Sequence, residues 1–182
     1  MALTATMHTF AIRLEDAVRD LREDLAFRVA RHPSETQESL VVRVLAYCLE
    51  YTEGIAFADG LPGRDEPAIA VRDLTGAIRV WIDVGAPDAA RLHRAGKAAE
   101  RVVVYTHKDP DLLIRQWSKE RIHRADRLEL YSIDRALRDG LTARMERRMV
   151  MTLAVEEAGR LRVTLGDDVI EGVVTRHPLG GR

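Results

Sequence analysis

Carboxylates and basic side chains gather between residues 65 and 97 in an order that suits phosphate chemistry. Asp65 and Glu66 precede a proline, and Asp83 lies at the end of an apolar run. A carboxylate at the end of a buried strand is costly unless it is paired, hydrogen-bonded or bound to a metal. The helix expected after this strand carries the basic side chains Arg91, Arg94 and Lys97. The pattern therefore predicts a site that holds a divalent cation beside a phosphate.

These groups are expected on a hairpin, a helix and a buried strand. Residues 68–71 and 77–84 form two strand-like runs joined by a turn at residues 74–76, and Gly85 and Pro87 end the second run. The β-branched run at residues 101–106 is typical of a parallel sheet. A β-α-β crossover through the intervening helix then makes the strands of Trp81 and Tyr105 parallel neighbours.

A long amphipathic helix is expected at residues 39–51. Its apolar residues recur along one stripe, and the single cysteine, Cys48, lies in that stripe as a core residue. Ser34 is a suitable N-terminal cap, and Glu35 and Glu38 put negative charge at the positive end of the helix. Glu38 also reaches the edge of the buried face. A short strand at residues 55–58 and a loop at residues 59–64 follow.

The two ends of the chain are predicted to be antiparallel β structure. Residues 3–14 and 24–31 alternate like strands and would form a hairpin with a wide loop. A helix at residues 111–124, a strand at 127–133 and a short helix ended by Gly140 lead to a meander of strands at 149–155, 161–165 and 169–174. We expect the hairpin and the meander to complete each other as a second antiparallel sheet.

Composition limits the possible classes. The 182 residues suit one domain, and 28 basic against 29 acidic residues give a net charge of −1. Binding to an anion must therefore depend on a local patch rather than on global charge. One cysteine allows neither an internal disulfide nor a cysteine-based zinc site. No apolar run of membrane-spanning length occurs, so no membrane association is expected, and a cytoplasmic location is predicted.

The chain resembles the YaeQ family across essentially its whole length, and four segments carry the resemblance. They are residues 30–36 (ARHPSET), 65–67 (DEP), 81–88 (WIDVGAPD) and 103–106 (VVYT). The family looks like a branch of the PD-(D/E)XK nuclease superfamily. The resemblance implies one α/β domain over residues 1–182, with a restriction-endonuclease-like α-β-β-β-α-β core at about residues 34–133. The terminal segments, 1–31 and 147–175, would form a β subdomain that carries the second sheet.

The resemblance also implies a Mg²⁺ or Mn²⁺ site. Carried over, its ligands are Glu38, with Glu35 as runner-up, either Asp65 or Glu66, and Asp83. The superfamily places a lysine two residues after the second acid, but this chain has Gly85 there. The missing positive charge would then come from the following helix, with Arg94 or Lys97 as the catalytic group and Arg91 and Arg94 binding phosphate.

Two functions follow from these residues. The first is a Mg²⁺-dependent phosphodiesterase that acts on DNA or RNA, which makes nucleic acid the expected partner. The second is a non-catalytic binding or regulatory protein that has lost the lysine; a protein partner is not specified by the sequence. Taken singly, the acids also fit turns and strand-end caps, and the basic residues fit a solvated helix face. Convergence of the acids in the folded chain is the property that separates these readings.

Overall fold

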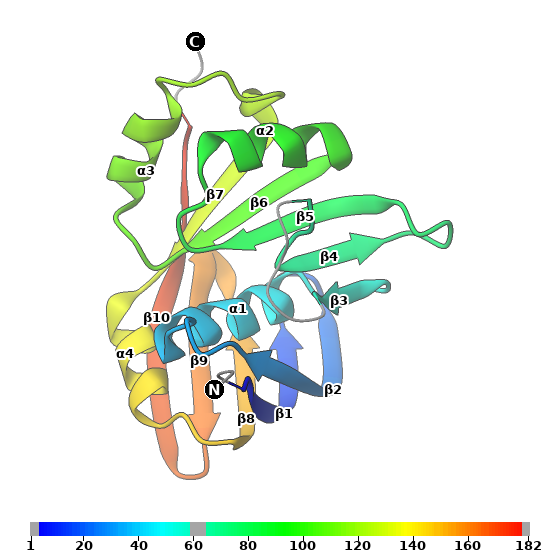
Figure 1. Ribbon diagram of the computed structural model, residues 1–182. Helices are drawn as coiled ribbons and strands as arrows, with labels where there is room; N and C mark the ends of the chain where they lie inside the picture. The colour runs from blue at the N-terminus through cyan, green and yellow to red at the C-terminus, as the bar shows by residue number, and fades with distance from the viewer. Residues whose placement is uncertain (1–3, 59–64, 180–182) are drawn as a thin grey trace. The chain divides into compact units, whose positions relative to one another are not determined.

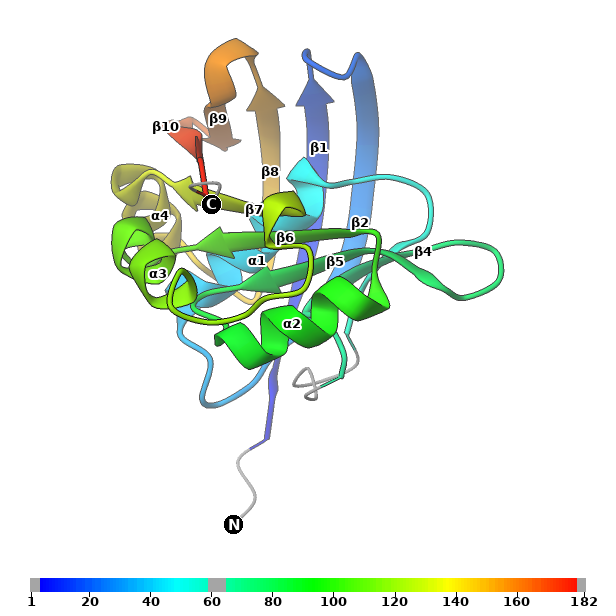
Figure 2. The same cartoon turned by 90° about the horizontal axis from the view of Figure 1, so that it is seen from above.

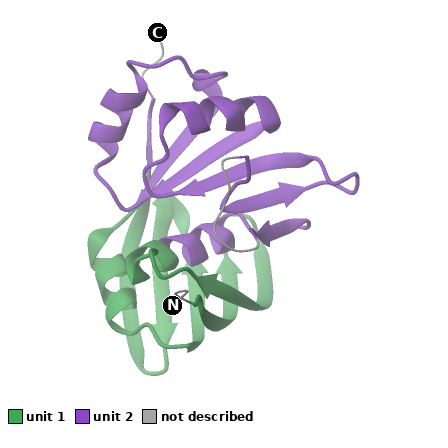
Figure 3. Cartoon of the chain, viewed as in Figure 1, with its two compact units in different colours: residues 1–41, 133–175 green, residues 42–132, 176–182 purple. Residues whose placement is uncertain are grey.

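The computed structural model describes residues 4–58 and 65–179. The loop predicted at residues 59–64 lies outside the described residues. The chain divides into two compact units (Figure 3). Unit 1 comprises Met1–Val41 and Ile133–Thr175, and unit 2 comprises Val42–Ser132 and Arg176–Arg182.

Unit 1 is mostly β structure, with one helix in its second segment. Its elements are β1 (Thr6–Asp16), β2 (Leu21–Arg31), α4 (Arg135–Ala143), β8 (Arg148–Val155), β9 (Arg160–Leu165) and β10 (Asp168–His177), the last of which ends in unit 2. β1 and β2 pair antiparallel, whereas β1 and β8 pair in parallel. Every second side chain of β1 is buried, including Phe10, Ile12 and Leu14, so the alternating pattern of the sequence marks the face that enters the core.

The β1–β2 hairpin is tighter than predicted. β1 continues to Asp16 and β2 begins at Leu21, so the wide loop expected between residues 14 and 24 is wrong. The buried carboxylate of Asp16 explains the difference, because it accepts hydrogen bonds from the backbone N–H groups of Val18 and Arg19. The Arg19 guanidinium also donates to it at 2.6 Å. A polar run that looked like a connection is thus a capped turn between long strands.

Unit 2 consists of a mixed sheet and the helices that pack on it. Its elements are α1 (Gln37–Leu49, which begins in unit 1), β3 (Ile55–Phe57), β4 (Ile69–Arg72), β5 (Ile78–Val84), α2 (Ala89–Ala98), β6 (Arg101–Thr106), α3 (Pro110–Trp117) and β7 (Leu128–Ile133). β3, β4 and β5 pair antiparallel, and β5, β6 and β7 pair in parallel. The predicted parallel pairing of the strands of Trp81 and Tyr105 is therefore confirmed. Figure 2 shows α2 lying along β5 and β6.

The core of unit 2 joins α2 and α3 to the sheet. Trp81, Leu92, Val104 and Leu130 are almost fully buried within this cluster. Cys48, in α1, is also buried, as predicted. The helix predicted at residues 111–124 is too long, since α3 ends at Trp117, and the helix predicted to end at Gly140 runs on to residue 143.

The predicted fold class is wrong in its central feature. All ten strands are hydrogen-bonded in one mixed sheet, in the order β2-β1-β8-β9-β10-β7-β6-β5-β4-β3 (Figure 1). A restriction-endonuclease-like core with a separate antiparallel sheet does not describe this arrangement. Alternation of apolar and polar residues identifies strands and their buried faces, but it does not show which strands pair with each other. No pattern in the sequence predicted the parallel pairing of β1 with β8. Among the described residues, no helix has both the length and the apolarity needed to cross a membrane.

Candidate functional site

Asp83, the predicted metal ligand at the end of β5, is buried and fully hydrogen-bonded. Its side chain is 3% exposed. The Arg91 guanidinium donates to both carboxylate oxygens, from Nε to Oδ2 and from Nη2 to Oδ1, each at 2.7 Å. The Trp81 indole N–H donates to Oδ2 at 2.9 Å, and the backbone N–H of Ala68 approaches Oδ1 at 3.4 Å. The negative charge that the sequence left unexplained is therefore neutralised by an arginine.

The turn between β5 and α2 aims Arg91 at this carboxylate. Gly85 has a φ of +97°, a conformation that residues with a side chain rarely adopt. Its N–H donates a hydrogen bond to the Tyr105 carbonyl. Asp88 then caps α2 by accepting from the Arg91 backbone N–H at 2.7 Å. The guanidinium of Arg91 lies over the Trp81 ring and also donates to the Glu66 carbonyl. The Arg91 guanidinium, which was predicted to bind phosphate, instead forms an ion pair and hydrogen bonds within the protein.

The other predicted metal ligands have different surroundings. Glu38 belongs to unit 1, where its carboxylate pairs with Arg138 of α4. The Asp65 side chain is 85% exposed and lies 3.6 Å from Arg94. Glu66 takes part through its backbone carbonyl, and the carbonyl of the runner-up Glu35 accepts from Arg31. Within residues 4–58 and 65–179, no group of three or more His, Cys, Asp or Glu side chains is arranged to hold a metal ion.

The two remaining basic candidates line a shallow groove on unit 2. The groove has a volume of about 230 Å³ and is lined by Asp65, Trp81, Arg94, Lys97 and Ala98. Arg94 is partly exposed and Lys97 is exposed. This groove brings together Asp65, Arg94 and Lys97 from the predicted set, and Asp65 is the one carboxylate among its described lining residues. It can attract an anion through its two cations, but it does not offer the clustered oxygen ligands that Mg²⁺ prefers.

A larger group of cations adjoins α2. The segment of residues 118–127 packs on this helix: His93 Nδ1 lies 3.1 Å from the Arg121 carbonyl oxygen, and a Cβ on Gly96 would lie 2.3 Å from the His123 carbonyl oxygen. We define the basic surface as five exposed side chains from α2 and this segment: Lys97, Lys119, Arg121, Arg124 and Arg127. The structure pairs none of them with a carboxylate in the part of the chain that it describes. Two acids, Glu120 and Asp126, lie in the same segment, so cations remain in excess.

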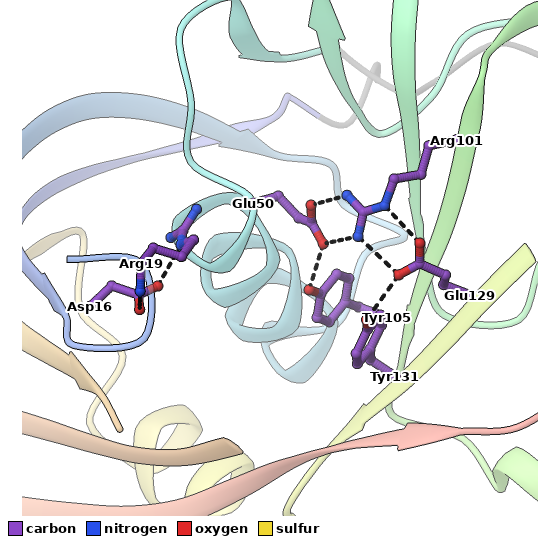
Figure 4. Close-up of polar contacts among 7 residues, drawn as sticks. All are labelled: Asp16, Arg19, Glu50, Arg101, Tyr105, Glu129 and Tyr131. Carbon is purple, nitrogen blue, oxygen red and sulfur yellow. Dashed lines mark hydrogen bonds and ion pairs between the residues drawn. The ribbon is translucent and has the colours of Figure 1, made fainter. Parts of the chain in front are cut away.

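Sequence reasoning missed an ionic network around Arg101, the first residue of β6 (Figure 4). The Arg101 guanidinium donates to Glu50, just after α1, at 2.5 Å and to Glu129 of β7 at 2.7 Å. The Tyr105 hydroxyl donates to Glu50 at 2.9 Å and the Tyr131 hydroxyl to Glu129 at 2.8 Å, and the two tyrosine rings stack. The sequence did contain a signal for this network, because Arg101 and Glu129 are opposite charges on two neighbouring strands that are otherwise largely apolar.

The network behaves as a structural cross-link. Hydrogen bonding from Arg101 lowers the pKa of Glu129. Burial raises the pKa of Tyr105 well above its ordinary value. The pKa of Tyr131 is also raised, mainly by burial and secondly by its hydrogen bond to Glu129. The hydroxyls therefore stay protonated and keep donating at neutral pH. No group in the network is left as a free base or nucleophile, and its effect is to tie the end of α1 to β6 and β7.

Comparison with known proteins places this arrangement in a family. The model of the family described as "YaeQ protein" matches residues 1–172. The proteins described as "Uncharacterized protein YaeQ" from Salmonella typhi and Escherichia coli K12 are each 36% identical over 107 residues. That match spans 59% of this chain and 59% of the length of each relative.

Two solved structures have the same fold. The YaeQ protein from Xanthomonas axonopodis pv. citri is 26% identical, with a TM-score of 0.83 and coverage of 95% of this chain and 98% of that one. The YaeQ protein from Pseudomonas syringae is 28% identical, with a TM-score of 0.86 and coverage of 98% and 97%. With a family match over nearly its whole length and two related structures, this chain belongs to the YaeQ family.

Proposed function

We propose that this protein is a non-catalytic binding protein whose basic surface takes a nucleic acid. The observation that carries the proposal is the set of exposed cations beside α2 that lack an ion-pair partner among the described residues. Phosphate contacts supply most of the affinity of sequence-independent nucleic-acid binding, and each needs one accessible cation. A chain with a net charge of −1 gains such affinity only from a local excess of this kind.

The state of Asp83 favours binding without hydrolysis. Metal-dependent hydrolysis needs a carboxylate that is open to the ion, together with a water that the ion activates. Here a guanidinium occupies both oxygens, and an indole and a backbone N–H approach the same oxygens. A cation would have to displace Arg91 from an ion pair whose acid is 3% exposed. The nuclease activity and the Mg²⁺ or Mn²⁺ site that the superfamily resemblance implied stay predictions, and the experiment below tests them as well.

Fluorescence anisotropy with labelled single-stranded DNA, duplex DNA and RNA of random sequence measures the binding. We expect wild-type protein to bind with an affinity that falls as salt rises, because phosphate contacts release counterions. The triple variant Lys97→Glu, Arg121→Glu and Arg124→Glu should weaken binding at least about tenfold and reduce the salt slope by about 2–3.

A matched control separates the basic surface from net charge. The triple variant Arg147→Glu, Arg148→Glu and Arg160→Glu changes the charge equally on exposed positions of unit 1 and should bind nearly as wild type does. Failure of wild type to bind any of the three nucleic acids, or equal weakening in both triples, overturns the proposal. Cleavage by wild type that requires Mg²⁺ or Mn²⁺, and that is lost in an Asp83→Asn variant shown by circular dichroism to be folded at the assay temperature, would establish the phosphodiesterase instead.

A further inference from the structure

His123 is an exposed residue of the basic surface whose backbone is anchored to the core. Ile122, the residue before it, packs against the hydrophobic core cluster of unit 2. The His123 carbonyl oxygen lies so close to α2 that a Cβ on Gly96 would be 2.3 Å from it. His123 itself is exposed. The segment of residues 118–127 therefore fixes the His123 backbone and leaves its imidazole accessible to solvent.

A second histidine restrains this imidazole. His93 of α2 donates from Nδ1 to the Arg121 carbonyl oxygen at 3.1 Å, since a carbonyl oxygen can only accept. The rings of His93 and His123 form a T-shaped contact, with centroids 6.2 Å apart and an interplanar angle of 71°. A side chain that is already restrained loses less conformational entropy when a ligand stacks on it.

The packing beneath the segment is close. A cavity between α2 and the segment, lined in part by Leu92, Ile122 and Leu128, has a volume of about 10 Å³, which holds at most about one water molecule. Arg124, directly after His123, has a φ of 54°, a left-handed conformation that residues other than glycine keep only where their surroundings determine it. The segment is thus preorganised before any ligand arrives.

Cations stand on both sides of this imidazole along the chain. Arg121 precedes His123 by two residues, Arg124 follows it, and Lys97 is the neighbour of Gly96 on α2. Proteins that bind single strands combine cations that follow the phosphates with aromatic rings on which bases stack. Histidine is one of the residues that stack on unpaired bases. The basic surface contains both parts of such a site.

We infer that the basic surface binds a single strand of nucleic acid, with one base stacked on His123; this inference rests on the proposed function. In a duplex the base faces are stacked on each other, and a protein must unstack a step to reach them. A duplex could therefore use the cations but not the imidazole. Charge alone favours the duplex, because two strands carry more phosphate per unit length than one. A preference for the single strand is then the sign of stacking.

A helix inserted into the major groove of a duplex is the competing mode of binding, and α2 does not suit it. Such a helix presents its side chains to the base edges. In α2 the Arg91 guanidinium is bound to Asp83. The segment of residues 118–127 also packs on the helix at His93 and Gly96, which keeps this part of α2 out of a groove.

Fluorescence anisotropy with labelled probes of equal length tests the inference. The probes are a thymidylate single strand, a uridylate single strand, a DNA strand whose nucleotides lack bases, and a DNA duplex. We expect wild type to bind thymidylate at least about fivefold more tightly than the strand without bases, because one stacked base adds that much. It should also bind thymidylate more tightly than the duplex, despite the higher charge density of the duplex. The tighter of thymidylate and uridylate identifies DNA or RNA as the preferred strand.

Variants of the same surface separate stacking from charge. His123→Ala should bind thymidylate at least about fivefold more weakly than wild type and bind the strand without bases equally well. His123→Phe keeps a ring at this position and should retain the preference for bases. Lys97→Ala removes a phosphate contact, so it should weaken binding to every probe alike and reduce the salt slope by about 1. Circular dichroism checks that each variant is folded.

Two results overturn this inference and leave the proposed function in place. The first is a wild type that binds the strand without bases, or the duplex, as tightly as it binds thymidylate and uridylate. The second is a His123→Ala variant that weakens binding to all probes equally or to none. A wild type that binds no probe overturns the proposed function and this inference together.

Discussion

Replacing Asp83 by asparagine should destabilise the protein strongly. The substitution keeps the shape of the side chain and removes its charge, and it puts an amide N–H₂ where a carboxylate oxygen accepts hydrogen bonds. Arg91, whose side chain is 17% exposed, then loses the carboxylate to which its Nε and Nη2 donate. Depending on the orientation of the amide, at least one of its two donors to Asp83 faces another donor.

The expected cost follows from the burial of the pair. Removing one partner of a buried ion pair costs about 3–5 kcal/mol, since the other charge stays buried and uncompensated. For a chain of this size, each kcal/mol lowers the Tm by about 2–4 °C, so a fall of roughly 6–20 °C is expected. The double variant Asp83→Leu with Arg91→Met removes both charges and should be more stable than Asp83→Asn, because no buried charge is left unpaired.

Urea and thermal unfolding of wild type and both variants, with and without Mg²⁺, provide the test. The ion-pair account expects a large loss in Asp83→Asn, partial recovery in the double variant, and the same Tm for wild type with or without the metal. A loss below about 1 kcal/mol in Asp83→Asn would refute the account, because a surface pair costs that little. A wild-type Tm that rises with Mg²⁺, while that of Asp83→Asn does not, would refute it by showing that Asp83 is a metal ligand.

Three further changes have defined outcomes. Gly96→Ala should cost about 1–3 kcal/mol in urea unfolding, because the new Cβ would lie 2.3 Å from the His123 carbonyl oxygen, which is backbone. Glu129→Gln should be less stable than wild type at neutral pH, and urea midpoints across pH should converge in acid. The bond from Arg101 lowers the folded pKa of Glu129 below 4.5, so the stabilisation is present above 4.5 and is lost as pH falls through the lowered value. Trp81→Phe removes the indole donor and should cost about 1.5–3 kcal/mol, read from chemical denaturation.

Local elements could be predicted well where periodicity and capping agree. The strand at Arg101–Thr106 was predicted to the residue, and α2 begins after Asp88, a capping residue between Pro87 and the helix. Predictions failed where a tertiary contact decided the outcome. Gly140 was expected to end a helix, but α4 continues past it; a Cβ at this position would lie 3.0 Å from the Ile170 side chain, so the glycine allows close packing rather than ending the helix. No local pattern encodes such a contact.

The site was harder to predict than the elements, for an electrostatic reason. The sequence showed that Asp83 needed a partner, and it placed three cations on the following helix, but a guanidinium and a metal ion both satisfy a buried carboxylate. The choice depends on which side of α2 each cation occupies. Asp88 caps the helix so that Arg91, in its first turn, reaches back to the strand end, whereas Lys97, in its last turn, is exposed.

The turn between β5 and α2, which was expected to direct a cation toward a phosphate, directs Arg91 toward Asp83 of the same chain. Gly85 adopts a φ of +97° directly after β5, and α2 then begins at Ala89 with Arg91 in its first turn, beside Asp83. Any side chain at residue 85 would be strained in that conformation. A lysine at this position would thus disturb the turn that holds Arg91. One backbone geometry therefore links the glycine at residue 85 to the closure of Asp83 by Arg91, and a Gly85→Lys substitution should weaken this ion pair.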